Sequence, residues 1–280
     1  TSQVRDMRDN VDNDELLEMV VKPIQDWMVR REELNQQLIE NVRVILLPDQ
    51  QERWTAFDRQ LFREKKLDQG RLSGGRIDLF VIARDLNLPA TEEPLRSLLR
   101  DYAVDLNREL RRRTVLIEGA SSDLLNTLRA RQFDPEEDLE QKRKINGLRV
   151  DVRNVNDRYR DVIAEAIPAP GGDQFRMEVL RRAYPKIYRR TNAQRVFDDA
   201  IERNGPEGPS ADAERYEAIL AIYDEFLAKL DRLNAEMYDV TRESEAALEM
   251  IRLENALRRI RGEELLTPED PVRELQKDKR

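Results

Sequence analysis

The sequence predicts an all-α protein, an elongated bundle of long antiparallel helices that is internally duplicated. Apolar residues recur at spacings of three and four over most of the chain, which is typical of amphipathic helices. Charged residues make up 38% of the 280 positions, a share that suits narrow bundles with a large surface. Shifting the chain by 121 residues brings apolar positions onto one another, which predicts two related halves.

The longest apolar stripe runs from Tyr216 to Ile260, and no Gly or Pro interrupts it before Gly262. At 1.5 Å per residue, this stripe predicts a single helix of roughly 75 Å. A helix of that length needs a partner along most of its surface, because isolated helices are only marginally stable in water. We therefore expect a coiled-coil-like contact along it.

Helix boundaries are marked by capping residues and by prolines. Asp134-Pro135 predicts a helix start, with the aspartate as N-cap and the proline at the first helical position. The segment 91–94 predicts a second start, and the Pro/Gly-rich segments 167–172 and 204–209 predict loops. No segment alternates between apolar and polar residues over a strand length, so we expect no sheet.

The internal repeat is carried by matched residues and by a shared loop. Each half places a proline loop before a large aromatic residue, and an asparagine recurs at the same offset. These features predict a first helical repeat at 14–133, a second at 134–262 and a C-terminal tail at 263–280 that docks or leads into a further repeat. The matched pairs include Leu34 with Val155, Asn35 with Asn156, Leu38 with Tyr159, and Trp54 with Phe175.

The chain has no Cys and no His. Their absence excludes Cys/His zinc sites, His-ligated haem, thiol catalysis and His acid–base chemistry. Oxygen-ligated Ca²⁺ or Mg²⁺ is still compatible with the composition, but no EF-hand spacing is present. The glycine-rich segment 70–76 lacks the Gly-Lys-Ser/Thr ending of a phosphate-binding loop, so we interpret it as a helix end and a turn. We predict no enzyme, no metal and no cofactor.

Charge and hydropathy narrow the range of partners. The net charge is −8, and the short arginine clusters sit among acidic residues, so we predict no nucleic-acid contact. No apolar run approaches the roughly 20 residues that cross a bilayer. The chain begins at Thr1 rather than Met, so we expect a processed or trimmed product, and a cleaved export signal is one explanation.

Large aromatic side chains form the candidate partner-binding set. They could line a groove for a peptide or an unfolded protein. Core packing is the alternative interpretation, because most of them lie at helical spacings. The candidate residues are Trp54, Phe57, Phe175, Tyr184 and Tyr188.

The segment Leu46-Leu47-Pro48-Asp49-Gln50 resembles the LTxxQ motif of Spy-like periplasmic helical proteins. The segment 266–270 is similar and keeps the Thr but ends in Asp, whereas 167–170 has lost the polar residues. The motif suits a helix start, with Thr as N-cap, Pro at the first position and an acid in the first turn. In the first copy Leu47 replaces the Thr, which removes that cap.

The resemblance implies an exported all-α cradle that binds clients without ATP. We therefore expect a non-catalytic helical binding or chaperone-like protein of the cell envelope, in the periplasm, with the cytoplasm as the alternative location. The alternative function is that of a structural or scaffold subunit of a larger assembly, in which the long helices hold the subunit in place. Both functions imply protein partners and a homo-oligomer or a subunit of a complex.

Overall fold

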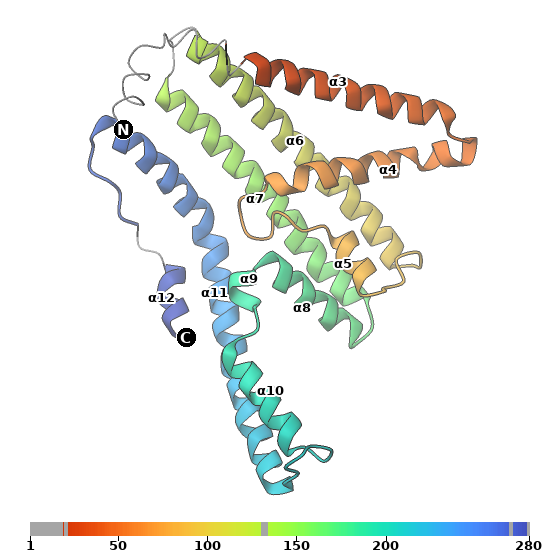
Figure 1. Cartoon of the computed structure of the whole chain (residues 1–280), viewed down its shortest axis with the longest axis vertical. Coiled ribbons are helices and arrows are strands. Elements are labelled where there is room, and N and C mark those ends of the chain that lie inside the picture. Colours follow the sequence, from red (N-terminus) through yellow and green to blue (C-terminus); the bar gives the residue numbers. More distant parts are fainter. Residues whose placement is uncertain (1–18, 20–21, 130–133, 269–270, 279–280) are drawn as a thin grey trace. The chain divides into compact units, whose positions relative to one another are not determined.

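The computed structural model describes residue 19 and residues 22–129, 134–268 and 271–278. Every regular element in these ranges is a helix and none is a strand, which confirms the all-α prediction (Figure 1). None of the helices in the described ranges combines the length and the apolar character that a membrane span requires.

The chain divides into two compact units. Unit 1 comprises residues 1–65 and 116–138, and unit 2 comprises residues 66–115 and 139–280. Two long helices, α6 (Leu95–Arg129) and α7 (Pro135–Ala166), contribute residues to both units. The units therefore do not follow the boundary at 133/134 that the repeat predicts, and the duplication stays a prediction.

Unit 1 contains the helices α3 (Lys22–Ile45) and α4 (Pro48–Lys66), which two leucines join. The Lys65 ammonium lies 2.9 Å from the Glu32 carboxylate and ties the end of α4 to α3. At the start of α4 the Leu47 N–H donates to the Gln50 side-chain oxygen at 3.0 Å. Gln50 therefore supplies one half of a capping box, although Leu47 has no side-chain oxygen to supply the other.

Three long helices lie side by side in unit 2, where α7 runs between α6 and α11 (Ala213–Arg261) (Figure 1). The Tyr102 hydroxyl of α6 donates to the Asn156 amide oxygen of α7 at 3.0 Å, and Tyr159 donates to Asp105 at 3.0 Å. That the long helices form an antiparallel bundle stays a prediction. Their contact is filled by buried side chains, among them Tyr102, Leu106, Leu110, Val152, Val155 and Ile163.

The helix predicted from Tyr216 to Ile260 is confirmed as α11. It begins after Asp212, whose carboxylate accepts the Arg215 N–H at 3.1 Å. It ends at Gly262, which has a φ of 69°. This left-handed conformation costs glycine little, and the Gly262 N–H donates to carbonyls of the last turn.

The other helices of unit 2 are short, and they show where the predicted boundaries differ from the structure. Helix α8 begins at Gly171, inside the predicted loop 167–172. At the motif-like segment 266–270, Pro268 itself is not helical, residues 269–270 lie outside the described residues, and α12 begins at Pro271. The Asn255 side chain bonds both the N–H and the carbonyl of Leu266 at 2.8 Å, which draws the preceding segment along α11. The short elements are η2 (Leu67–Gln69), α5 (Leu79–Asp85), α8 (Gly171–Ala183), α9 (Pro185–Tyr188), α10 (Asn192–Asn204) and α12 (Pro271–Asp278).

Candidate functional site

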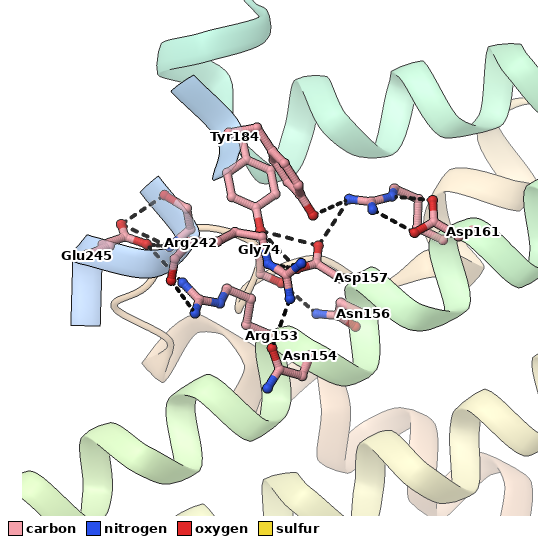
Figure 2. A network of polar contacts seen from close by, with 12 residues as sticks. Gly74, Arg153, Asn154, Asn156, Asp157, Asp161, Tyr184, Arg242 and Glu245 are labelled. Carbon is pink, nitrogen blue, oxygen red and sulfur yellow. Dashed lines mark hydrogen bonds and ion pairs between the residues drawn. The ribbon is translucent and has the colours of Figure 1, made fainter. Parts of the chain in front are cut away.

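A network of buried polar side chains joins α7 to α11 and to the segment after α8 (Figure 2). Asp157 of α7 lies at its centre. Its carboxylate accepts the Tyr184 hydroxyl at 3.1 Å and lies 3.1 Å from both the Arg160 and the Arg242 guanidinium. Arg160 also donates to the Tyr238 hydroxyl at 2.9 Å. Two long helices and the segment between α8 and α9 are thus joined through one carboxylate.

Burial sets the proton affinities of this network. Desolvation raises the pKa of Asp157, and the neighbouring Arg160 and Arg242 oppose that rise. Desolvation likewise raises the pKa of the Tyr184 phenol, with the Asp157 charge adding to the effect. Because protein donors already occupy the carboxylate and the phenol donates to it, the arrangement suits a cross-brace better than a general base.

A second part of the network anchors the glycine-rich segment 70–76. Glu245 of α11 accepts both the backbone N–H and the hydroxyl of Ser73 at 2.9 Å. The Asn156 amide donates to the Gly74 carbonyl at 2.7 Å. Arg153, almost fully buried, donates to the Arg242 carbonyl at 2.9 Å. The segment predicted to be a turn is therefore held by two long helices.

Gly74 has to be glycine for two reasons. Its φ is 77°, in the left-handed region that side chains with a Cβ rarely adopt. A Cβ at this position would also lie 3.0 Å from the Tyr184 hydroxyl and 3.1 Å from the Arg153 Cγ. The backbone at Gly74 is therefore part of the packing around Asp157.

A pocket of about 380 Å³ lies beside this network and is bordered by α12. Ser73, Tyr184 and Glu245 line it together with Val272 and Gln276 of α12. Ser73 and Glu245 bond each other, and Tyr184 bonds Asp157, so these lining groups already have protein partners. Within the described residues, no cluster of three acidic side chains is placed to hold a metal ion.

The structure does not bring the five predicted partner-binding aromatics together. Phe175 and Tyr184 are buried core residues of unit 2, and Tyr188 is half-buried in the same unit. Trp54 and Phe57 belong to unit 1, where their ring centroids lie 5.5 Å apart and Phe57 is 44% exposed. For Phe175 and Tyr184 the core-packing alternative describes the observed position.

A surface that sequence reasoning missed runs along α3. Trp27, Leu34, Leu38 and Ile45 fall within about 20° of one line on the helix, at 100° per residue. All four are exposed, from 51% for Leu34 to 78% for Ile45. We refer to these four residues as the α3 stripe.

The signal that could have revealed the α3 stripe was a second apolar stripe on the same helix. The half-buried apolar residues Ile39 and Val42 lie roughly a quarter turn away from it, together with the polar Asn35. A helix with two apolar lines has more apolar surface than one intramolecular contact can cover. Sequence reasoning instead used Leu34 and Leu38 only as positions matched between the two predicted repeats.

Comparison with known proteins gives no match to this chain, whether among protein families, curated proteins or solved structures.

Proposed function

We propose that this chain is a non-catalytic helical binding protein with chaperone-like activity, acting in the cell envelope, and that the α3 stripe receives its partner. The stripe is the observation that carries this proposal. Exposed apolar side chains that share one face of a helix mark interaction surfaces more often than scattered ones do. The resemblance of Leu46–Gln50 to the LTxxQ motif supports the envelope location and the chaperone-like role.

The stripe is large enough to bind a partner segment. Eighteen residues separate Trp27 from Ile45, so the stripe extends about 27 Å at 1.5 Å per residue. Fully burying an exposed side chain such as leucine contributes about 1.5–3 kcal/mol, which offsets part of the cost of ordering a bound segment. Trp27 carries the Arg31 guanidinium at 4.7 Å from its ring centroid, which adds a cationic edge to the apolar surface.

The test is suppression of aggregation by the full chain. Reduced insulin and heat-treated citrate synthase serve as clients, and light scattering is measured at near-stoichiometric ratios. The variant Leu34→Gln/Leu38→Gln removes the middle of the stripe. We expect it to lose most of the suppression while its unfolding midpoint stays within a few degrees of the wild type, because both side chains are exposed.

A matched control separates the stripe from general apolar exposure. Val196 and Ile222 are exposed on α10 and α11, at 66% and 59%. The variant Val196→Gln/Ile222→Gln should suppress aggregation as well as the wild type does. Equal loss in both variants, or no suppression by the wild type with either client, would contradict the proposal.

The spacing of the stripe favours a second function, a structural subunit of a larger assembly. Trp27, Leu34, Leu38 and Ile45 are separated by seven, four and seven residues, which is the spacing of a coiled-coil seam. Such a seam fits one long partner helix better than it fits many unfolded clients. Cross-linking in native cells distinguishes the two functions: a subunit is recovered with one partner at fixed stoichiometry, and a chaperone is recovered with many.

A further inference from the structure

A second surface, in unit 2, has properties that the proposed function does not use. A groove of about 1050 Å³ lies between the start of α10 and the face of α11. Among the described residues, five cationic ones and no acidic one line it: Lys186, Arg189, Arg190, Arg195 and Lys229. We refer to it as the basic groove. The groove is positively charged, whereas the net charge of the whole chain is −8.

Two of the five cations have a partner of their own, and three have none among the described residues. Arg190 pairs with Asp198, and Lys229 lies 2.6 Å from Glu225. Lys186, Arg189 and Arg195 are exposed. A concave surface with three uncompensated positive charges attracts negative charge and concentrates it locally.

The base of the groove is apolar. Phe226, Leu230 and Leu233 of α11 line it, and Leu230 is almost fully buried. The two first residues of α10, Asn192 and Ala193, border it. The start of a helix carries a partial positive charge, which adds to that of the three cations.

We propose that the basic groove binds an acidic amphipathic segment of a partner protein, in which apolar residues alternate with carboxylates. The carboxylates would pair with Arg189, Arg195 and Lys186, and the apolar residues would cover the base of the groove. Charge complementarity carries this choice of occupant.

The apolar base favours a peptide over a nucleic acid. Single-stranded nucleic acids stack their bases on aromatic side chains, and the groove has one such residue, Phe226, beside two leucines. The net charge of −8 also repels a long polyanion at a distance, whereas a short acidic segment feels chiefly the local cations.

The experiment measures binding of fluorescent peptides to the full chain by anisotropy. The probe is a 16-residue peptide of Glu, Leu and Ala in which Leu or Ala alternates with Glu along the chain. One comparison peptide has Gln for every Glu, and another has Ala for every Leu. We expect the first peptide to bind, both comparison peptides to bind at least tenfold more weakly, and the affinity to fall as salt is added.

Charge reversal locates the site. The variant Arg189→Glu/Arg195→Glu should weaken binding of the acidic peptide at least tenfold, and the milder Arg189→Gln/Arg195→Gln should weaken it less. The control Arg181→Glu/Arg203→Glu reverses two exposed arginines that do not line the groove and should bind as the wild type does. Far-ultraviolet circular dichroism verifies that each variant keeps its helical content.

Several outcomes would overturn the proposal. Unchanged binding in Arg189→Glu/Arg195→Glu, or an equal loss in the control, would place the peptide elsewhere. If the peptide with Ala for every Leu bound as tightly as the probe, the apolar base of the groove would have no part in recognition. If a single-stranded oligonucleotide displaced the peptide at the same concentration of negative charge, the groove would be a general site for polyanions. Since the α3 stripe is intact in all these variants, failure here leaves the chaperone test unaffected.

Discussion

The phenol oxygen of Tyr184 lies 3.1 Å from Oδ2 of Asp157, and both side chains are buried between α7 and the segment that precedes α9. Asp157 also contacts Arg242, so the same carboxylate reaches α11. This relationship explains why a tyrosine predicted to bind a partner is a core residue. The Tyr184 hydroxyl donates a hydrogen bond to the buried Asp157 carboxylate, which no longer has water as a partner.

Tyr184→Phe removes one donor from Asp157 and leaves the ring in place. A hydrogen bond to a charged group contributes about 1.5–3 kcal/mol, so we expect the free energy of unfolding to fall by about that amount. Urea unfolding followed by circular dichroism measures it. Tyr223→Phe is the control, because its half-buried hydroxyl lies 3.5 Å from Asp198, and it should change stability by less than about 0.5 kcal/mol. Equal effects of the two substitutions would contradict the assigned role.

Asn156→Leu tests the buried amide that joins three segments. Asn156 is fully buried, and replacing it leaves the Gly74 carbonyl and the Tyr102 hydroxyl without this partner. Each unsatisfied buried group costs about 1–3 kcal/mol, so we expect a loss of at least 2 kcal/mol in urea unfolding. Asn35→Leu replaces the asparagine at the matching repeat position, which is half-buried, and should be close to neutral. A neutral Asn156→Leu would refute the role of the amide.

Gly172→Ala tests the close approach of α8 to the end of α7. A Cβ on Gly172 would lie 2.2 Å from the Ala164 carbonyl oxygen, which is backbone and has little room to move. We expect a loss of about 3 kcal/mol or more, from overpacking. Gly147→Ala is the opposite case, because a Cβ there meets nothing within 4 Å inside α7. It should stabilise the chain by about 0.5–1 kcal/mol through helix propensity, and thermal unfolding of both variants measures the difference.

Arg113→Met tests a buried charge that lacks compensation. The side chain is fully buried, and its Nε and Nη1 have no hydrogen-bond partner in the described part of the chain. Burial, with repulsion from Arg149, lowers the pKa of Arg113 to about 10. The charged form is thus disfavoured in the folded state, and this cost is present below about pH 10 and is relieved above it.

Replacing a buried ion pair by apolar residues is often stabilising by about 1–4 kcal/mol, and a buried charge without an acidic partner has no ion-pair attraction to lose. We therefore expect Arg113→Met to raise the midpoint of urea unfolding at neutral pH. Arg112→Met, at an exposed position paired with Glu109, should stay within about 0.5 kcal/mol of the wild type. A clear loss of stability in Arg113→Met would show that the hydrogen bond from Nη2 to the Lys66 carbonyl outweighs the cost of burying the charge.

The Tyr188 phenol makes stability sensitive to alkaline pH. Burial raises the pKa of Tyr188 to about 12, above the value near 10 of an unfolded tyrosine. A raised pKa stabilises the fold below pH 10, and that contribution is lost as the pH rises from 10 through 12. Partial exposure keeps the effect below about 2 kcal/mol. Urea unfolding across this range should show a shallower decline in Tyr188→Phe than in the wild type, and parallel curves would contradict the assignment.

Much of the fold follows from local sequence signals. The stripe from Tyr216 to Ile260 and the terminating Gly262 predicted α11, because helical periodicity and a left-handed C-terminal glycine act within a few residues of each other. Asp134-Pro135 likewise marked the start of α7, where the Asp134 carboxylate accepts the Glu136 N–H at 2.8 Å. Pro268 itself is not helical, and the side chain of a distant residue, Asn255, bonds the backbone of Leu266 two positions earlier.

The candidate surfaces could not be predicted in this way. The sequence by itself determined the helices, their caps and the exclusion of His and Cys chemistry, because these depend on residue type and on neighbours along the chain. Only the tertiary structure decided that Phe175 and Tyr184 are buried, that the α3 stripe is exposed and that Lys186, Arg189 and Arg195 share one groove. Exposure and charge clustering depend on which helices cover one another, and those contacts join residues that are distant in the sequence.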